Sequence, residues 1–260
     1  MKKTMLNEFT GKEIKELLNS GKEITAIVSF GSCECHADHL PLGPDYFVPE
    51  EVARRVANKL DDVIVVPCTP FGTSIHYNSF PMSISLRFET NIMLAEDIFT
   101  SLIRHGIKQI VVINGHDGNI PVIEIAARNI KEQHHEVSII YIPAWWDMVG
   151  KKLGNDFFDS WNHTGLGHGG EGETSAVMAV KPDLVDLDAA VCQIPNDVFD
   201  DYGITYIWDI AEITKTGATG DPRCATLEKG NQIIDCLVNT IVEIIEKLNK
   251  TSWKYSLRKI

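Results

Sequence analysis

Four apolar runs rich in Val and Ile, each separated from the next by a helical pattern, are the strongest constraint on the fold of this chain. They cover residues 24–30, 63–67, 109–114 and 137–142. Near-continuous apolar runs are typical of strands that are buried on both faces of a parallel sheet. The order therefore predicts one α/β domain over residues 1–260, a three-layer αβα sandwich with a mostly parallel central sheet.

Capping residues set the expected helix ends. Thr10 with Glu13 forms a capping box before an apolar stripe, and Gly21 ends that helix. Pro49, followed by two acidic residues, is expected to open the next helix. The expected helices cover residues 10–21, 49–60, 90–105, 121–135, 171–181 and 225–249.

Composition limits the partners and the compartment. The chain has 24 Lys+Arg against 36 Asp+Glu, a formal net charge of −12, which argues against a nucleic-acid or acidic-membrane partner. No apolar run reaches the ~20 residues of a membrane span, and the first residues lack the apolar core of a signal peptide. We therefore expect a cytoplasmic protein that acts on a small molecule.

The six cysteines do not form a compact framework, so we expect free thiols in a reducing compartment. Cys33 and Cys35 flank Glu34 and alternate with it and His36. If Glu34 and His36 face a common site, the two thiols face away into packing. A thiolate ligand remains an alternative.

The loop after the first strand carries a concentration of metal-ligand types. Glu34 and His36 project to the same side of an extended backbone. A loop of under ten residues can fold Asp45 back towards them, and His39 lies between. Two carboxylates and an imidazole suit Zn²⁺, Mn²⁺ or Fe²⁺. The alternative is an ordinary solvated polar loop.

Two further loops can open onto the same rim, because ligands gather at the carboxyl ends of parallel strands. Residues 114–119 place His116 on a tight glycine turn after a strand, although such a turn is also a common strand-to-helix link. A glycine-rich loop at 165–175 carries His168, Glu171 and Glu173. So many glycines suggest close approach to the backbone, but the acids could equally favour a helix start.

Two other features have a structural interpretation by default. The sequence of residues 217–230 predicts turns that run into the last helix, with Thr226 as its cap. Trp145, Trp146 and Trp161 could wall a pocket, although core packing is the commoner role of tryptophan.

Taken together, these segments resemble the creatininase family of metal-dependent amidohydrolases. Its Gly-Ser-x-Glu-x-His-x-x-His-Leu-Pro-Leu-x-x-Asp pattern matches residues 31–45, and Asn-Gly-His-x-Gly-Asn matches 114–119. His-x-Gly-Glu-x-Glu-Thr-Ser matches 168–175, and Gly-Asp-Pro followed by Ala-Thr and Gly matches 220–230. Four ordered patterns are specific where any one alone would be weak.

The resemblance implies an αβα fold with two divalent metal ions, Zn²⁺, Mn²⁺ or Fe²⁺, at the carboxyl edge of the sheet. It implies that Asp45 bridges the ions, that Glu34 and His116 complete one site, and that His36 belongs to the other. Members that act on creatinine carry a glutamate two positions after the histidine of the second pattern, where this chain has Gly118. The resemblance implies that Glu171 supplies the missing carboxylate.

A second departure concerns the substrate. Creatinine-acting members place a tryptophan four positions before the loop histidine, where this chain has Thr164. Gly118 and Thr164 both count against creatinine itself, although they leave the metal chemistry intact.

The expected activity is metal-assisted hydrolysis of a C–N amide bond, in a cyclic amide or a formamide, by an activated water. His168 is the candidate proton donor to the departing nitrogen. Asp117 and His39 are expected to orient the metal ligands.

Three alternatives remain open. One is a formylamino-pyrimidine nucleotide deformylase, which needs positive groups such as Arg87, Arg104 or Arg223 near a phosphate. Another is a hydrolase of a keto-inositol ring. The third is a non-catalytic protein with a closed structural metal site.

The resemblance also implies assembly, because relatives form homo-oligomers, often hexamers. Residues 71–81 resemble the family loop before Pro-Gly-Thr, here altered to Pro81-Met82-Ser83. His76 in that loop could line the pocket, lie at a subunit contact or be an ordinary surface histidine. The end of the chain, residues 253–260, could be a contact tail or frayed.

Overall fold

A parallel sheet of four strands forms the centre of the molecule, in a computed structural model that describes residues 2–160, 167–195 and 207–254. The strand order is β2-β1-β3-β4, and every pairing is parallel. This confirms the expected fold class. The strands are β1 (Thr25–Phe30), β2 (Val63–Thr69), β3 (Gln109–Asn114) and β4 (Ser138–Ile142).

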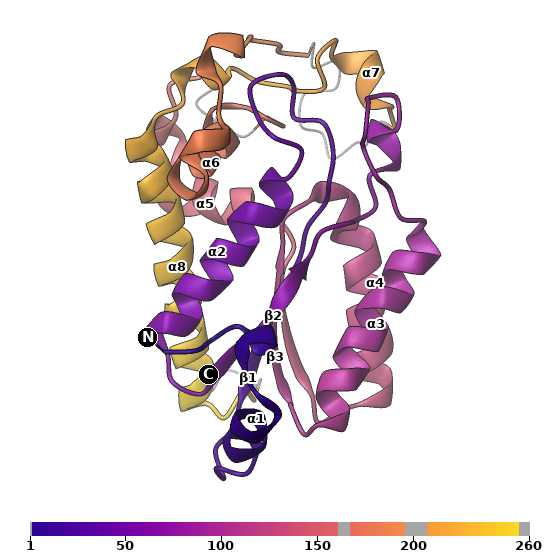
Figure 1. The fold of residues 1–260 in the computed structure, drawn as a ribbon, viewed down its shortest axis with the longest axis vertical. Helices are drawn as coiled ribbons and strands as arrows, with labels where there is room; N and C mark the ends of the chain where they lie inside the picture. The colour runs from indigo at the N-terminus through magenta and orange to yellow at the C-terminus, as the bar shows by residue number, and fades with distance from the viewer. Residues whose placement is uncertain (1, 161–166, 196–206, 255–260) are drawn as a thin grey trace, which may run out of the picture.

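Helices cover both faces of the sheet and complete the three layers (Figure 1). On one face lie α2 (Pro44–Lys59) and α8 (Leu227–Lys250), with α5 (Trp145–Leu153) and α6 (Glu171–Val180) packed against α8. On the other face lie α3 (Phe88–Arg104) and α4 (Ile120–Gln133). Two shorter α-helices are α1 (Gly11–Leu18) and α7 (Ile210–Ile213). Short 3₁₀ turns cover Leu6–Glu8, Ile75–Tyr77, Asp117–Asn119, Asn155–Phe157, Pro182–Leu184, Leu187–Ala189 and Pro222–Cys224.

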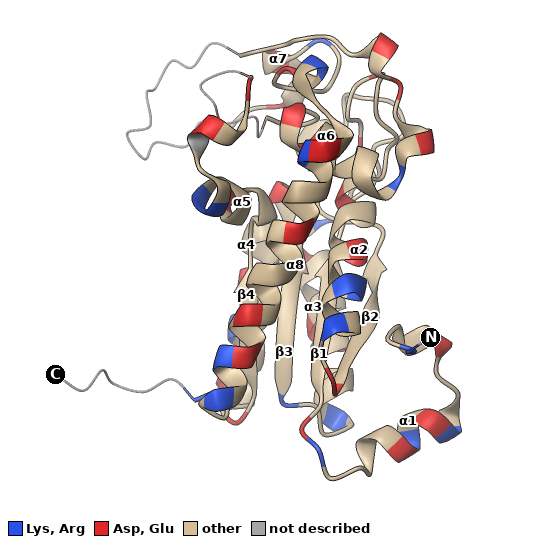
Figure 2. Cartoon of the chain, turned by 90° about the vertical axis from the view of Figure 1, so that its left-hand side faces the viewer, with Lys and Arg blue, Asp and Glu red and all other residues tan. Residues whose placement is uncertain are grey.

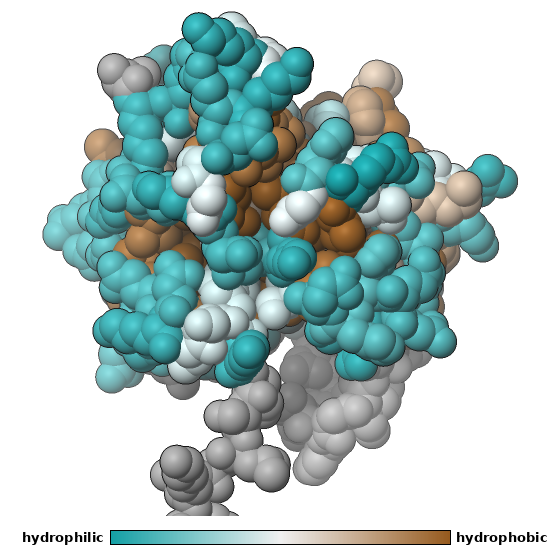
Figure 3. Space-filling view, turned by 90° about the horizontal axis from the view of Figure 1, so that it is seen from below, coloured by the Kyte–Doolittle hydropathy of each residue, from teal (hydrophilic) through white to brown (hydrophobic). Residues whose placement is uncertain are grey.

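Alternating strand side chains build a separate apolar core on each face. Ile27 and Val111 point to the α2–α8 side, whereas Val28 and Val112 point to the α3–α4 side. Because both faces are covered, most strand residues are apolar, as the sequence predicted. Lys, Arg, Asp and Glu lie mainly on the flanking helices (Figure 2). Viewed from below, where the strands begin, hydrophilic residues surround a centre in which hydrophobic residues show (Figure 3).

Helix α2 begins earlier than the sequence indicated. Pro44, not Pro49, occupies its first turn, and Asp45 is therefore a helical residue. A proline inside a helix cannot donate to the carbonyl four residues before it. Here that carbonyl belongs to Asp45, and it lies against Gly31 and Gly115, where added Cβ atoms would come within 2.8 and 2.1 Å of it. The two glycines let the head of α2 approach the ends of β1 and β3.

The other expected helices are confirmed within a few residues, and α5 and α7 were not foreseen. Trp145 and Trp146 open α5 after Ala144, so the helix lacks a polar N-cap residue, and Asp147 is the one acidic residue in its first turn. Of the described helices, none has both the length and the apolarity needed to cross a bilayer. All six cysteines are free thiols.

Replacing Gly115 with alanine is predicted to destabilise the fold. The new Cβ would collide with the Asp45 carbonyl oxygen, which cannot move without shifting α2. We expect a loss of about 1–3 kcal/mol in the free energy of unfolding, measured by urea denaturation. Gly11→Ala is the control, because its Cβ would meet nothing within 4 Å. Equal stability of the two variants would contradict this account of the α2 contact.

Candidate metal centre

The site lies where three loops meet beyond the carboxyl ends of β1 and β3. The loop after β1 carries Glu34 and His36, the turn after β3 carries His116, and the segment before α6 carries His168. β1 lies between β2 and β3, so the connections diverge to either side at this point. Such a switch point in a parallel sheet leaves a crevice in which ligands bind.

One set of donors surrounds the Nδ1 atom of His116. Glu34 Oε1 lies 3.1 Å from this nitrogen, and Asp45 Oδ2 lies 3.4 Å from it. All three side chains are buried. His116 Nε2 donates to the Thr73 carbonyl at 2.9 Å, which leaves Nδ1 of the neutral ring as an acceptor. Three acceptors thus face one another.

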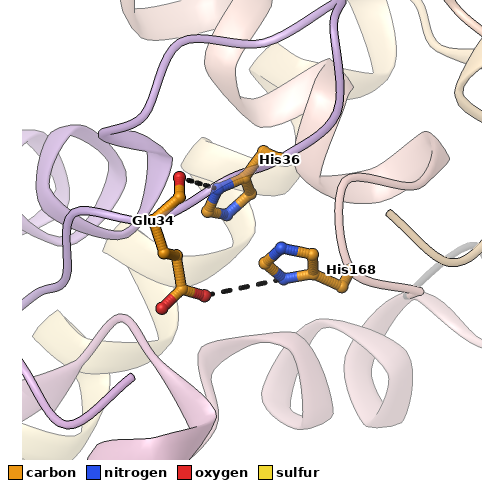
Figure 4. Close-up of side chains that lie close together, drawn as sticks. All are labelled: Glu34, His36 and His168. Carbon is orange, nitrogen blue, oxygen red and sulfur yellow. Dashed lines mark hydrogen bonds and ion pairs between the residues drawn. The ribbon is translucent and has the colours of Figure 1, made fainter. Parts of the chain in front are cut away.

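A second set surrounds the Nε2 atom of His36. Asp45 Oδ1 lies 3.2 Å from this nitrogen, and Glu173 Oε1 lies 3.6 Å from it. His36 Nδ1 donates to the Glu34 carbonyl at 3.1 Å, so its tautomer is also fixed by the backbone (Figure 4). Asp45 therefore offers one oxygen to each set.

The unpaired oxygens fit a pair of cations. Glu34 Oε1 and Asp45 Oδ2 are buried without a hydrogen-bond partner in the described structure. A buried carboxylate oxygen in this condition is costly unless a positive charge compensates it. The donor separations of 3.1–3.6 Å also match the roughly 3.4 Å expected between ligands around a tetrahedral zinc ion.

The electrostatics of the cluster favour positive charge. Burial lowers the pKa of His36, but the Asp45 and Glu173 carboxylates outweigh it and raise that pKa well above its usual value. Burial also lowers the pKa of His116, but the Glu34 and Asp45 carboxylates outweigh it and raise that pKa well above its usual value. Conversely, burial raises the pKa of Asp45, but the His36 and His116 imidazoles hold it well below the usual range.

The structure does not bring Glu171 into either set, which corrects the expectation that it is the missing ligand. The Glu171 carboxylate accepts hydrogen bonds from the Ser160 and Asp159 amides and pairs with Lys229. Glu173 takes the expected place beside His36. The two glutamates are separated by about 200° around the helix, so only one can face the site. The sequence shows that Glu171 and Glu173 must face different sides of the helix, but it does not show which of them faces the site.

His168 lies above the two sets. Its Nδ1 atom is 3.9 Å from Glu34 Oε1, and its ring centroid is 4.1 Å from that of His36 (Figure 4). Its Nε2 donates to the Cys35 carbonyl at 2.8 Å, which leaves Nδ1 free of a proton in the neutral ring. Burial first, and then the nearby His36 charge, lower the pKa of His168.

His39 supports the loop rather than a metal ligand. Its Nε2 atom lies 3.0 Å from both the Gly169 carbonyl and the Thr174 hydroxyl. Glu173 holds the same loop, because its Oε2 accepts from the Gly169 amide at 2.6 Å. His39 was expected to orient the metal ligands, but it contacts the residues that follow His168.

Asp117 faces the site from the other side, with His76 beside it. Asp117 Oδ1 is 3.4 Å from both His116 Nδ1 and His76 Nε2. The His76 ring stacks on His116 with centroids 5.7 Å apart. His76 therefore lies beside His116 and Asp117, but it is not among the described residues that line the cavity, and the three roles that the sequence left open stay open. Partial loss of hydration raises the pKa of Asp117, but the contact with His76 outweighs this effect and lowers that pKa.

A cavity of about 130 Å³ opens over the cluster. Asp45, Asp117, His168 and Glu173 contribute polar groups, and aromatic rings wall one side. These rings are Trp145 and Trp146, so the pocket interpretation holds for both, whereas Trp161 and Thr164 fall outside the described residues. No cysteine belongs to a potential metal-binding group within the described ranges.

The space beside Gly118 explains the absence of a glutamate there. A Cβ atom at Gly118 would lie 2.0 Å from the Thr73 carbonyl oxygen and 2.6 Å from His116 Nε2. Any side chain would therefore break the hydrogen bond that fixes His116. The carboxylate next to His36 has to come from another element, and it comes from α6 in the form of Glu173.

Comparison with known proteins agrees with this fold. The family model for creatininase, creatinine amidohydrolase, matches residues 7–245. A creatinine amidohydrolase from Pseudomonas putida is 28% identical over 260 residues, covering 95% of this chain and 97% of the relative. A mycofactocin precursor peptide peptidase from Mycolicibacterium smegmatis is 25% identical, covering 85% of this chain and 84% of the relative.

Solved structures show the same likeness. A crystal structure of creatinine amidohydrolase superposes with a TM-score of 0.81 at 28% identity, covering 95% of this chain and 98% of the other. A manganese creatininase gives a TM-score of 0.80 with the same coverage and identity. The fold and the site thus define an amide-bond hydrolase with a candidate centre for divalent metals. The chain belongs to the creatininase family.

Gly118→Ala is predicted to weaken metal binding while the sheet still forms. Its Cβ would displace the Thr73 carbonyl from His116, and loss of such an orienting contact typically costs about 10–100-fold in metal affinity. Competition with a chelating dye measures the change, and circular dichroism checks the fold. An unchanged affinity would show that the Thr73 contact is dispensable.

Proposed function

We propose that this protein is a two-metal hydrolase that cleaves the C–N bond of a small amide, either a cyclic amide or a formamide. The observation that carries the proposal is the sharing of Asp45 between two donor sets, one around His116 and one around His36. The sets lie at the wall of a cavity that also contains His168.

The residues divide between the ions by their distances. Glu34, Asp45 and His116 would hold one ion, and His36, Asp45 and Glu173 the other. Two divalent ions, Zn²⁺, Mn²⁺ or Fe²⁺, would supply Lewis-acid chemistry that polarises an amide carbonyl and makes water acidic. The protein contributes a buried site with fixed imidazole tautomers, so the ligands need no rearrangement.

His168 is the proposed proton carrier. Its lowered pKa keeps the ring neutral near pH 7, and the Cys35 carbonyl directs the unprotonated Nδ1 towards Glu34 and the cavity. A neutral imidazole in that position accepts a proton from the attacking water and delivers it to the departing nitrogen. Asp117 on the opposite wall is placed to orient the substrate, and His39 steadies the loop behind His168.

The cavity favours a small substrate without a strong negative charge. No Lys or Arg lies among the described residues that line it. Arg223 is paired with Asp221 at 2.7 Å, and neither Arg87 nor Arg104 reaches the lining. This lack of positive charge weighs against a nucleotide phosphate and so against the deformylase alternative. Gly118 continues to count against creatinine.

A closed structural metal site is the weaker alternative, because the donors border an open cavity rather than a fully enclosed cage. We further propose a cytoplasmic homo-oligomer, a hexamer by analogy with relatives. Exposed apolar side chains support assembly, among them Met93 on α3 at 62% exposure and Met82 in the preceding loop at 70%.

Asp45→Asn is predicted to abolish the binding of both ions, because each donor set loses a charged oxygen. Elemental analysis of protein dialysed against Zn²⁺ or Mn²⁺ measures the stoichiometry. Asp183→Asn, which alters an exposed carboxylate that does not line the cavity, is the matched control. Two ions bound to Asp45→Asn would end the shared-carboxylate proposal.

His168→Asn is predicted to keep both ions and to lose turnover by roughly 10²–10⁴-fold, the usual contribution of a positioned proton carrier. A hydrolysis screen over creatinine, hydantoins, lactams, formamido-pyrimidines and short peptides identifies the substrate for this comparison. Full turnover by His168→Asn, or by metal-free protein, would contradict the mechanism.

A further inference from the structure

Glu171 is the most deeply buried charge whose contacts the proposed chemistry does not use. Its side chain is fully buried at the first position of α6. Both carboxylate oxygens are occupied: the Asp159 amide donates at 3.2 Å to Oε1, and the Ser160 amide donates at 2.7 Å to Oε2. The Lys229 ammonium also pairs with Oε1.

Lys229 brings a second helix into the same cluster. It belongs to the first turn of α8, and only 15% of its side chain is exposed. Its Nζ atom also contacts Asp159 Oδ2 at 2.6 Å and the Cys224 carbonyl at 3.4 Å. Lys229 pairs with both Asp159 and Glu171, and it thus joins three separate pieces of chain: the segment at 159–160, the head of α6 and the head of α8.

The position of this cluster along the chain gives it a consequence for the site. His168 lies eight residues after Ser160 and three before Glu171. The Glu171 carboxylate therefore links Ser160, which precedes His168 in the chain, to the head of α6, which follows it. On the other side of the same helix turn, Glu173 faces His36.

We propose that Glu171 and Lys229 form a clasp that positions His168, and that Glu171 is not a metal ligand. The two glutamates of the His-x-Gly-Glu-x-Glu pattern then have different tasks. Glu173 holds the ion next to His36, and Glu171 holds the loop that presents the imidazole. The clasp acts through His168, so this inference rests on the proposed role of that histidine.

Two variants test the clasp without changing the donor sets. Glu171→Gln removes the charge, and Lys229→Met removes the partner while keeping an apolar stem of similar length. We expect both variants to bind as many ions as the wild type in elemental analysis. We expect both to lose turnover roughly ten- to a hundredfold, in kcat rather than KM, because a small displacement of a reacting group costs this much. Lys229→Arg, which keeps the charge, should recover most of the loss.

A substrate-independent readout separates failure of the clasp from failure of the proposed function. Side-chain ¹H–¹³C spectra of the zinc-loaded protein, with the His168 signal assigned from His168→Asn, report the imidazole environment directly. We expect Glu171→Gln and Lys229→Met to shift the His168 signal and to leave the His134 signal, far from the site, in place. The paired variant Glu243→Gln with Lys247→Met removes an exposed ion pair from the same helix α8 and should change neither signal.

The opposite results are equally clear. Loss of one ion by Glu171→Gln, with full occupancy in Lys229→Met, would identify Glu171 as a ligand and overturn the proposal. An unshifted His168 signal in both variants would also overturn it. If Glu171→Gln does not fold, Lys229→Met and Lys229→Arg decide the question alone.

Discussion

The position of one carboxylate governs the rest of this site. Asp45 lies in the first turn of α2 and directs one oxygen to His36 and the other to His116. That arrangement requires the head of the helix to press against the ends of β1 and β3. Gly31 and Gly115 make the approach possible, because side chains there would collide with the Asp45 carbonyl. Packing of bare backbone thus sets the geometry of the charged groups.

Backbone carbonyls do the corresponding work for the imidazoles. Each imidazole donates one N–H to a backbone carbonyl: His116 to Thr73, His36 to Glu34 and His168 to Cys35. In the neutral form of each ring, the second nitrogen carries no proton and faces the carboxylates or the cavity. Buried acceptors with fixed orientation cannot form hydrogen bonds with one another, but they can bind cations. The same arrangement explains why Gly118 has no side chain, since any Cβ would lie on the Thr73 contact.

Most of the fold and much of the site were accessible from the sequence. The near-continuous Val/Ile runs predicted a parallel sheet with both faces covered. Consecutive strand residues point to opposite faces, so a run of apolar residues implies that both faces are buried. The loops after β1 and β3 were placed at one rim, because the carboxyl ends of parallel strands point the same way. Helix α5 was missed, since it starts with two tryptophans and has no polar cap.

By itself, the sequence determined which segments would meet: His36, Asp45, His116 and His168 follow from strand order and from the family patterns they carry. Only the tertiary structure showed which of Glu171 and Glu173 lies beside His36. Both sit in the first turn of α6 with the same chemistry, and nothing local distinguishes them. Which of them lies beside His36 depends on which side of α6 faces His36 and which faces Lys229 on α8, and that is fixed by the packing of α6 against α8 and α2.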